Sequence, residues 1–247
     1  MSALPSLGPD YRAAVFGASG GIGVALVALL QADDHCAIVH AGSRVTPDAG
    51  AKLLPFAFDL EDEKSIAIAV QEITACSKEL DLVIVATGLL HDDALAPEKT
   101  MRALNADALA RCFAINAIGP ALVAKHVTPF LPRQRKSVFA ALSARVGSIA
   151  DNRQGGWHGY RASKAALNQL IRTCAIEVAT KNKHAIYATL HPGTVDTGLS
   201  RPFQAAVRPG QLFSAPTSAA HLLRVIDELT PEQSGQFLAW DAKPIPF

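Results

Sequence analysis

A tyrosine and a lysine lie four positions apart in the segment Tyr160-Arg161-Ala162-Ser163-Lys164, and this pair could move a proton. Residues at this spacing share one face of an α-helix, so the ammonium can stabilise a phenolate beside it. A free tyrosine has a pKa of about 10, which a neighbouring cation lowers. The pair therefore predicts a proton donor, although the spacing alone also fits an ordinary helix with a solvated face.

A glycine-rich turn, Gly17-Ala18-Ser19-Gly20-Gly21-Ile22-Gly23, lies about 140 residues before the tyrosine, between an apolar run and a helical pattern. A helix N-terminus offers unpaired N–H groups to a phosphate, and glycine lets the backbone approach it. The turn therefore predicts a site for the pyrophosphate of a dinucleotide, although tight turns also use glycine for steric reasons alone. The residues expected to bind there are Gly17, Ser19, Gly21, Ile22 and Gly23. Together, the turn and the tyrosine–lysine pair indicate hydride transfer coupled to proton transfer.

The choice of nicotinamide cofactor depends on the end of the second predicted strand, where the chain reads Gly42-Ser43-Arg44. A carboxylate there would bond the ribose 2′-hydroxyl of NAD and repel the 2′-phosphate of NADP. A guanidinium binds a phosphate with two hydrogen bonds, and Ser43 can add a third. We therefore expect NADP to be preferred. If Arg44 only solvates a loop, NAD is bound as well.

The composition argues against several other classes of protein. A net charge of +1, with basic residues spread along the chain, is not the footprint of nucleic-acid binding. No uninterrupted apolar stretch approaches the roughly 18 to 20 residues that span a bilayer, and no signal peptide is expected. Cys36, Cys76, Cys112 and Cys174 are widely spaced, which favours neither a metal site nor a disulfide framework. These features predict a cytoplasmic protein without a bound metal.

Short apolar runs alternate with longer helical patterns along the whole chain. Runs such as residues 82–86 are apolar at every position, which indicates burial on both faces of a parallel sheet. Residues 1–247 are therefore predicted to form a single α/β domain, a doubly wound (Rossmann-type), mainly parallel sheet of seven strands with helices on both faces. The predicted strands are residues 12–17, 36–41, 53–58, 82–86, 137–142, 185–190 and 236–240; the helices are 21–33, 65–80, 103–131, 160–183 and 219–229; and the long loops are 145–158 and 197–216.

Ligands of such a sheet bind beyond the carboxyl ends of its strands, and the notable residues cluster there. Taken in order, the motifs resemble the short-chain dehydrogenase/reductase family over nearly the whole chain. The resemblance implies that Tyr160 and Lys164 are catalytic and that Asn116 anchors a water linked to Lys164. It also implies that Asp59-Leu60 faces the adenine and that the turn from His191 to Thr197 holds the nicotinamide carboxamide. The further cofactor contacts that it implies are Ala86, Thr87, Gly88, Pro192, Gly193, Val195 and Thr197.

Two departures from the family pattern affect the site. The usual Asn-Asn-Ala-Gly is Val85-Ala86-Thr87-Gly88 here, which keeps only the glycine that lets the backbone approach the cofactor. The family commonly has Ser-Ser where this chain has Ser143-Ala144, and counting back from Gly147 puts the usual catalytic serine at Ala144. Ser143 is expected to donate to the substrate oxygen instead; otherwise Ser148 or the loop must supply that donor.

The detail around Ser143, Tyr160 and His191 is similar to the C-factor-like branch of the family. The resemblance implies reduction of a carbonyl, or its reverse, with Tyr160 as general acid or base and Lys164 holding the nicotinamide ribose. An alternative is a nucleotide-binding signalling protein of the C-factor type with little or no turnover. A methyltransferase also uses a glycine turn, but it has no use for Tyr160 and Lys164.

Substrate and oligomeric state are less directly encoded. The region after Thr197 is apolar enough to cover a small hydrophobic substrate, or to pack on a second subunit. The two helices at residues 103–131 and 160–183 carry more apolar surface than one sheet face covers, so we expect a homodimer or homotetramer. The contact residues expected are Ala117, Ala121, Ala124, Ala166, Leu170 and Cys174.

Overall fold

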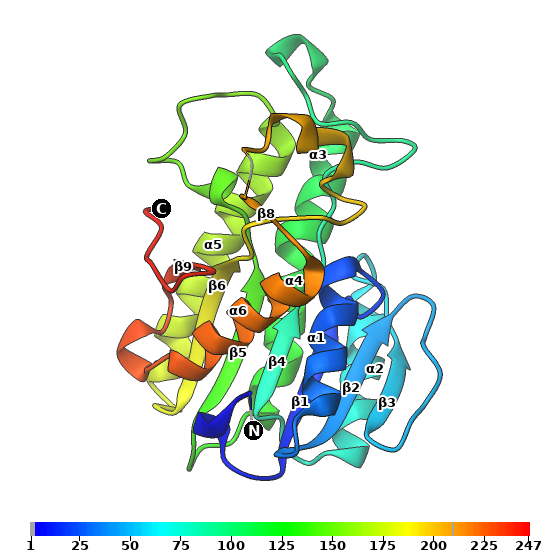
Figure 1. The fold of residues 1–247 in the computed structure, drawn as a ribbon, viewed down its shortest axis with the longest axis vertical. Coiled ribbons are helices and arrows are strands. Elements are labelled where there is room, and N and C mark those ends of the chain that lie inside the picture. Colours follow the sequence, from blue (N-terminus) through cyan, green and yellow to red (C-terminus); the bar gives the residue numbers. More distant parts are fainter. Residues whose placement is uncertain (1–2, 209) are drawn as a thin grey trace.

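Seven parallel strands form one sheet in the computed structural model, which describes residues 3–208 and 210–247 (Figure 1). The strand order is β3-β2-β1-β4-β5-β6-β9, so the direction of winding reverses between β1 and β4. The strands are β1 (Tyr11–Phe16), β2 (Cys36–Ser43), β3 (Leu53–Ala57), β4 (Leu82–Val85), β5 (Ser137–Leu142), β6 (Ala185–His191) and β9 (Phe237–Ala239). The predicted doubly wound fold is therefore confirmed. Residues 1–2 and 209, which fall within the expected domain and the 197–216 loop, lie outside the described residues.

Helices cover both faces of the sheet because successive residues of each buried strand point to opposite sides. Val15 of β1 packs on one side with α1 and α6, which lie nearest the viewer in Figure 1. Phe16 packs on the other side with α2, α4 and α5. The helices are α1 (Gly21–Ala32), α2 (Glu63–Cys76), α3 (Ala106–Phe113), α4 (Gly119–Val127), α5 (His158–Ala179) and α6 (Ala215–Glu228). Every residue of β4 and β5 is buried, as the uniform apolar runs predicted.

The single helix expected over residues 103–131 is interrupted, and that prediction was wrong in detail. A 3₁₀ turn at Met101–Ala103 is followed by α3, a π-helical turn at Ala114–Ile118, and α4. Pro120 has no N–H to continue the ladder of hydrogen bonds, which favours a wider turn just before it. The π-turn contains the buried Asn116.

The helical run Ala106–Phe130 is 25 residues long, with a mean hydropathy of 1.3 over its most apolar window. By length and composition alone it could cross a membrane, which the count of uninterrupted apolar residues did not anticipate. The run also carries Asp107, Arg111 and Lys125, and it packs against α2 and α5.

The upper loops in Figure 1 hold structure that the sequence pattern did not predict. Within the expected loop at residues 197–216, Arg201–Ala206 forms a 3₁₀ helix, and β8 (Leu212–Phe213) pairs with β7 (Thr194–Val195). α6 begins at Ala215, because the Ser214 hydroxyl accepts from the Thr217 N–H and caps the helix. The remaining 3₁₀ turns are Pro5–Leu7, Thr128–Phe130, Arg145–Gly147 and Pro231–Gln233.

Candidate active site

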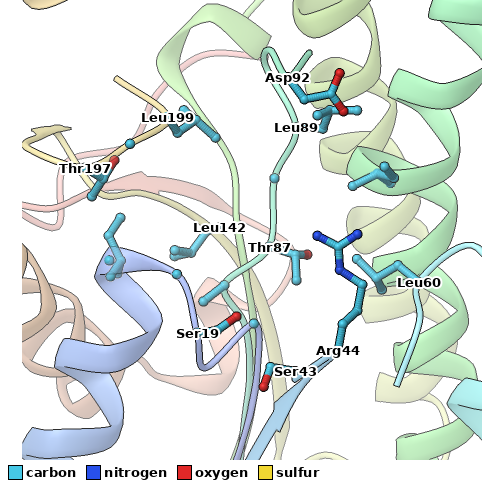
Figure 2. Close-up of a pocket in the computed structure, with 18 of the residues that line it drawn as sticks. Ser19, Ser43, Arg44, Leu60, Thr87, Leu89, Asp92, Leu142, Thr197 and Leu199 are labelled. Atoms are coloured by element: carbon cyan, nitrogen blue, oxygen red, sulfur yellow. The ribbon is translucent and has the colours of Figure 1, made fainter. Parts of the chain in front are cut away.

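A cavity of about 630 Å³ opens at the carboxyl ends of the central strands, where the winding of the sheet reverses (Figure 2). It brings together residues from the first glycine turn to the segment after β7, far apart in sequence. The predicted site residues that line it are Gly17, Ser19, Gly21, Ile22, Ser43, Arg44, Asp59, Leu60, Ala86, Thr87, Gly88, Ser143, Tyr160, Lys164, Pro192 and Thr197. The predicted site residues that do not line it are Gly23, Asn116, Gly193 and Val195.

Two of these four are glycines that allow close packing behind the cavity. A Cβ on Gly23 would collide with the carbonyl oxygen of Gly17, so only glycine lets α1 start so near the turn. Gly193 has a φ of +82°, and a Cβ there would stand 2.6 Å from the ring of Phe213. Val195 is buried in β7, directly paired with Phe213. These positions therefore shape the wall of the cavity.

The N-terminus of α1 forms the floor of the cavity and has no side-chain cap. Its cap residue is Gly20, and no described side chain accepts from the N–H groups of the first turn. Gly17 has a φ of +97°, and a Cβ there would lie 3.0 Å from the carbonyl carbon of Ala86. Unpaired N–H groups at a helix start attract an anion, so this floor suits a pyrophosphate. The side chain of Thr197 lies over Gly21 and covers one side of it.

Arg44 reaches over the cavity from the end of β2. Figure 2 places its guanidinium between Thr87 and Leu60. Its side chain is exposed and makes no ion pair with any described residue, so the charge is available to a ligand phosphate. The Ser43 hydroxyl donates to the Val45 carbonyl oxygen at 2.5 Å, which directs its proton away from the cavity. In this arrangement Arg44, rather than Ser43, supplies the donors expected at a 2′-phosphate.

Tyr160 and Lys164 lie at the start of α5, and both are buried. The Lys164 Nζ lies 5.9 Å from the centroid of the Tyr160 ring and donates to the Leu142 carbonyl oxygen at 2.7 Å. Burial raises the pKa of Tyr160 above its ordinary value and lowers the pKa of Lys164 to about 7. The sequence led us to expect that the ammonium would lower the tyrosine pKa. The structure does not show that lowering: burial raises the pKa of Tyr160, and the nearby Cys112 thiol adds to the rise.

Two buried hydroxyls on the cavity wall have no hydrogen-bond partner among the described residues, namely Ser143 Oγ and Thr87 Oγ1. An orphaned buried hydroxyl is unfavourable unless a ligand completes it. Ala144 is absent from the cavity wall, and the Ser148 hydroxyl already accepts from the Asp151 N–H at 3.1 Å. Among the alternatives for the missing serine, Ser143 is therefore the one placed to donate into the cavity.

Asn116 does not line the cavity but forms hydrogen bonds to two segments beside it, the loop after β4 and α5. Its Oδ1 accepts from the Leu89 N–H at 2.8 Å, and its Nδ2 donates to the Leu89 carbonyl oxygen and to Ser163 Oγ. A Cβ on Gly88 would lie 3.8 Å from Asn116 Oδ1 and 3.7 Å from Lys164 Nζ, so both groups flank that glycine. Both donors of the amide are used in this way, so the side chain links the loop after β4 to α5.

Several lining residues carried no sequence signal. Asp92 and Arg111 form an ion pair of 2.7 Å on the wall, which lowers the pKa of Asp92 together with a bond from the Ala94 N–H. The Leu199 carbonyl oxygen lies 3.2 Å from His91 Nε2, and this contact joins the segment after β7 to the loop after β4. The lining residues that we missed are Gly20, Phe58, Glu61, Leu89, His91, Asp92, Arg111, Ile115, Leu142, Gly198 and Leu199. Gly20 lies within the glycine turn and Leu199 in the apolar region after Thr197, and several of the others adjoin a predicted site residue in sequence, so those positions could have been suggested.

Histidine, cysteine and carboxylate side chains do not gather at this site. Within residues 3–208 and 210–247, no three of them lie close enough together to hold a metal ion.

Comparison with known proteins identifies relatives over most of the chain. The model of the short chain dehydrogenase family matches residues 12–208. The chain is 37% identical over 139 residues to the C-signal protein of Myxococcus xanthus, covering 56% of this chain and 78% of that protein. It is 30% identical over 181 residues to a 1-hydroxy-2-glutathionyl-2-methyl-3-butene dehydrogenase of Rhodococcus sp. (strain AD45), covering 72% of this chain and 74% of that protein.

Solved structures share the fold over nearly the full length. The carbonyl reductase Sniffer of D. melanogaster superposes with a TM-score of 0.84 at 21% identity, covering 97% of this chain and all of that chain. An NADPH-bound carbonyl reductase from chicken fatty liver superposes with a TM-score of 0.85 at 23% identity, covering 99% and 98% of the two chains. At these identities the superpositions establish the shared fold.

Proposed function

The chain belongs to the short-chain dehydrogenase family, and from that premise we propose that it interconverts a carbonyl compound and an alcohol with NADP(H), with NAD(H) as a weaker partner. The family resemblance inferred from the sequence is thereby confirmed, and the C-signal relative agrees with the C-factor-like branch. One observation carries the proposal. A protonated tyrosine, a buried lysine and an orphaned serine hydroxyl meet in one cavity, above a helix N-terminus left open for an anion.

The residues present fit a nicotinamide dinucleotide. The open first turn of α1 suits the pyrophosphate, and Arg44 suits a 2′-phosphate, with two hydrogen bonds from one guanidinium. The residue directly after β2 is Arg44 rather than a carboxylate that would repel that phosphate. The cofactor supplies hydride, and the chain supplies everything else that the reaction needs.

Proton transfer falls to Tyr160. Reduction of a carbonyl leaves negative charge on its oxygen, and a phenol held protonated by burial is ready to neutralise that charge. The Ser143 hydroxyl can donate to the same oxygen and has no other described partner. Burial lowers the pKa of Lys164 to about 7. The group beside the Tyr160 ring is therefore an ammonium below that pH and a neutral amine above it. The raised pKa of Tyr160 means that its phenol carries the proton that the reaction needs.

We propose a small hydrophobic carbonyl compound as substrate. Leu199 lines the cavity, and the ring of Phe203 in the 3₁₀ helix beyond it lies 4.9 Å from Trp157 and 5.7 Å from His91. Trp157 in turn lies 6.3 Å from the ring of Tyr160. His91 and Tyr160 line the cavity, and the rings of Phe203 and Trp157 pack against them, so apolar groups adjoin the reacting centre and favour an apolar ligand.

A screen of aldehydes, ketones and quinones with NADPH and NADH tests the proposal. We expect NADPH absorbance to fall with at least one hydrophobic carbonyl compound, and no oxidation without a carbonyl. Tight NADPH binding without turnover of any compound would contradict the enzymatic proposal.

A second candidate function is a nucleotide-binding signalling protein with little turnover. The 37% identity to C-signal and the alanine at position 144 favour it. The same screen separates the two, because only the enzyme consumes NADPH in proportion to added carbonyl.

We further propose a homodimer or homotetramer formed through the outer faces of α4 and α5. Leu170 is 37% exposed, and Cys174, four residues later, is half-buried. Ala117 and Ala124 are buried in the core, so these two residues are removed from the expected subunit contact. Light scattering should give a multiple of 26.0 kDa, and Leu170→Glu should reduce it to the single-chain mass. All four cysteines are free thiols, which suits the proposed cytoplasmic location.

A further inference from the structure

The chain enters α5 through an unusual backbone path. Gly155, Gly156 and Trp157 have φ values of +65°, +67° and +53°, three left-handed residues in succession. Glycine adopts this conformation freely, but a tryptophan rarely does, and it persists only where the surroundings hold it. The feature lies three residues before Tyr160, so whatever holds it also sets the start of the catalytic helix.

Glu98 holds this entry from a loop about 60 residues earlier in the chain. Its carbonyl oxygen accepts from the Trp157 N–H at 2.5 Å, and its carboxylate Oε2 accepts from the Gly159 N–H at 3.1 Å. The side chain is 8% exposed, and Glu98 makes no ion pair with any described residue. The buried carboxylate is therefore balanced by the N-terminus of α5, whose free N–H groups favour a negative charge.

The fit around this carboxylate is close. A Cβ on Gly159 would stand 3.0 Å from Glu98 Oε1 and 3.1 Å from Leu109 Cδ2, so the position accommodates glycine alone without movement. On the other side of the same segment, Arg161 Nε donates to the Gly156 carbonyl oxygen at 2.9 Å. The cap residue Trp157 supplies no side-chain acceptor to α5. The carboxylate of Glu98, from a segment distant in sequence, accepts from the first turn instead.

We propose that Glu98 is a positioning residue for the reaction: it fixes the first turn of α5, and through that turn the phenol of Tyr160 and the ring of Trp157. The catalytic meaning of this role rests on the proposed function, whereas the mechanical role does not. The Trp157 ring contacts both Tyr160 and Phe203, so loss of the bonds from Glu98 should loosen the acid and the aromatic packing beside it.

Trp157 itself provides a direct readout that does not need turnover. The chain has two tryptophans, so Trp240→Phe leaves Trp157 as the single fluorophore. In that background, Glu98→Leu should raise acrylamide quenching of Trp157 about threefold, because local opening exposes the ring. Glu98→Gln keeps an acceptor oxygen and should stay close to the parent. Asp62→Ala, which removes the side-chain cap of a different helix, α2, is the matched control and should leave quenching unchanged.

Turnover gives the second readout. Glu98→Leu should lower kcat about 10²-fold, since small displacements of a reacting group have effects of that size. Its Kd for NADPH should change little, because Glu98 does not line the cavity. Glu98→Gln should recover most of kcat, and Asp62→Ala should keep it. Gly159→Ala is the second variant: it keeps Glu98, pushes on its carboxylate and should reproduce the Glu98→Leu effects even if that protein folds poorly.

The outcomes separate the two proposals. Unchanged quenching in both Glu98→Leu and Gly159→Ala overturns the positioning role, whatever the turnover. The positioning role is also overturned if Asp62→Ala loses as much kcat as Glu98→Leu. Loss of any helix cap would then lower the rate, and the position of Glu98 would not matter. If the parent protein oxidises NADPH with none of the carbonyl compounds in the screen, the proposed function is overturned. The quenching result still decides whether Glu98 holds α5.

Discussion

Two helices begin at the edge of the sheet where the cavity opens, and their N-termini differ: one has no side-chain hydrogen-bond acceptor among the described residues, and the other has a carboxylate. α1 starts at Gly21, its cap residue Gly20 supplies no side-chain cap, and its first turn lines the cavity. α5 starts at His158 after its cap residue Trp157, and the buried carboxylate of Glu98 accepts from its first turn. The open end can receive an anionic ligand, whereas the closed end holds a side chain in place. On the two proposals above, the same local chemistry would serve binding in one helix and positioning in the other.

The two ends also differ in how they are built. The α1 turn has a local hydrogen bond, from the Gly20 N–H to the Gly17 carbonyl oxygen, and is also held by bonds from the Gly17 and Ala18 N–H groups to the Gly42 carbonyl oxygen. The α5 entry depends on contacts with Glu98 that only the folded chain brings together. Damage at the α1 end should therefore appear in cofactor binding, and damage at the α5 end should appear in the rate.

The largest effect is expected from Tyr160→Phe at the α5 end. Removing the phenol hydroxyl should lower kcat by 10²-fold or more, about the contribution of a general acid, while NADPH binding is nearly unchanged. Steady-state kinetics on the carbonyl compound found by the screen, with a fluorescence titration of NADPH, measure both. A Tyr160→Phe protein that keeps its activity would show that the proton donor does not lie at the N-terminus of α5.

Ser143→Ala should follow, with a loss of about 10²-fold in kcat, the size expected for one donor to a developing oxyanion. Its hydroxyl faces the cavity without a described partner, whereas that of Ser148 bonds to the Asp151 N–H. Ser148→Ala is therefore the matched control and should retain most activity. The reverse pattern in kcat would move the donor to Ser148.

Gly17→Ala should act at the α1 end and weaken NADPH binding by up to about 10²-fold, because strain at a positive φ is of order 1 to 3 kcal/mol. Gly50→Ala is the control, since Gly50 does not line the cavity, its φ is not positive, and a Cβ there would lie 3.6 Å from its nearest neighbour. Titration of both variants decides the matter. Equal dissociation constants would mean that the turn does not hold the cofactor.

Arg44→Asp should reverse the preference for NADPH over NADH, which we expect to be about tenfold, the value of one charge-assisted hydrogen bond to a phosphate. Arg44→Ala should abolish the preference without reversing it, because it removes the attraction and adds no repulsion. Dissociation constants for both cofactors provide the check. Equal affinities in the parent protein would contradict this role of Arg44.

The smallest effect is expected from the buried lysine at the α5 end. Burial lowers the pKa of Lys164 to about 7, against 10.5 ordinarily, so above pH 7 the unfolded chain binds more protons than the folded one. The free energy of unfolding should then rise by about 1 kcal/mol between pH 7 and pH 8, and Lys164→Met should remove that rise. Urea unfolding without cofactor at the two pH values measures it. Identical pH dependence in the two proteins would argue against the shift.

Much of this protein follows from local sequence alone. Strands such as β4 and β5 are apolar at nearly every position, and the glycine turn and the Tyr160–Lys164 spacing are contiguous patterns. They depend on backbone geometry and burial over a few residues, which neighbours in sequence determine. The doubly wound sheet and most of the cavity lining could be predicted for this reason. The expected continuous helix at residues 103–131 was wrong, because the apolar period does not distinguish an α-helix from one broken by a π-turn.

Only the tertiary structure decided how the site works. The unpartnered hydroxyl of Ser143, the raised pKa of Tyr160 and the hydrogen bonds of Glu98 depend on which groups lie within a few ångströms and how far water is excluded. A tyrosine beside a lysine is expected to be acidic in water, and burial reverses that expectation. Sequence spacing specifies which residues share a helix face, whereas solvation and long-range contacts exist only once the chain has folded.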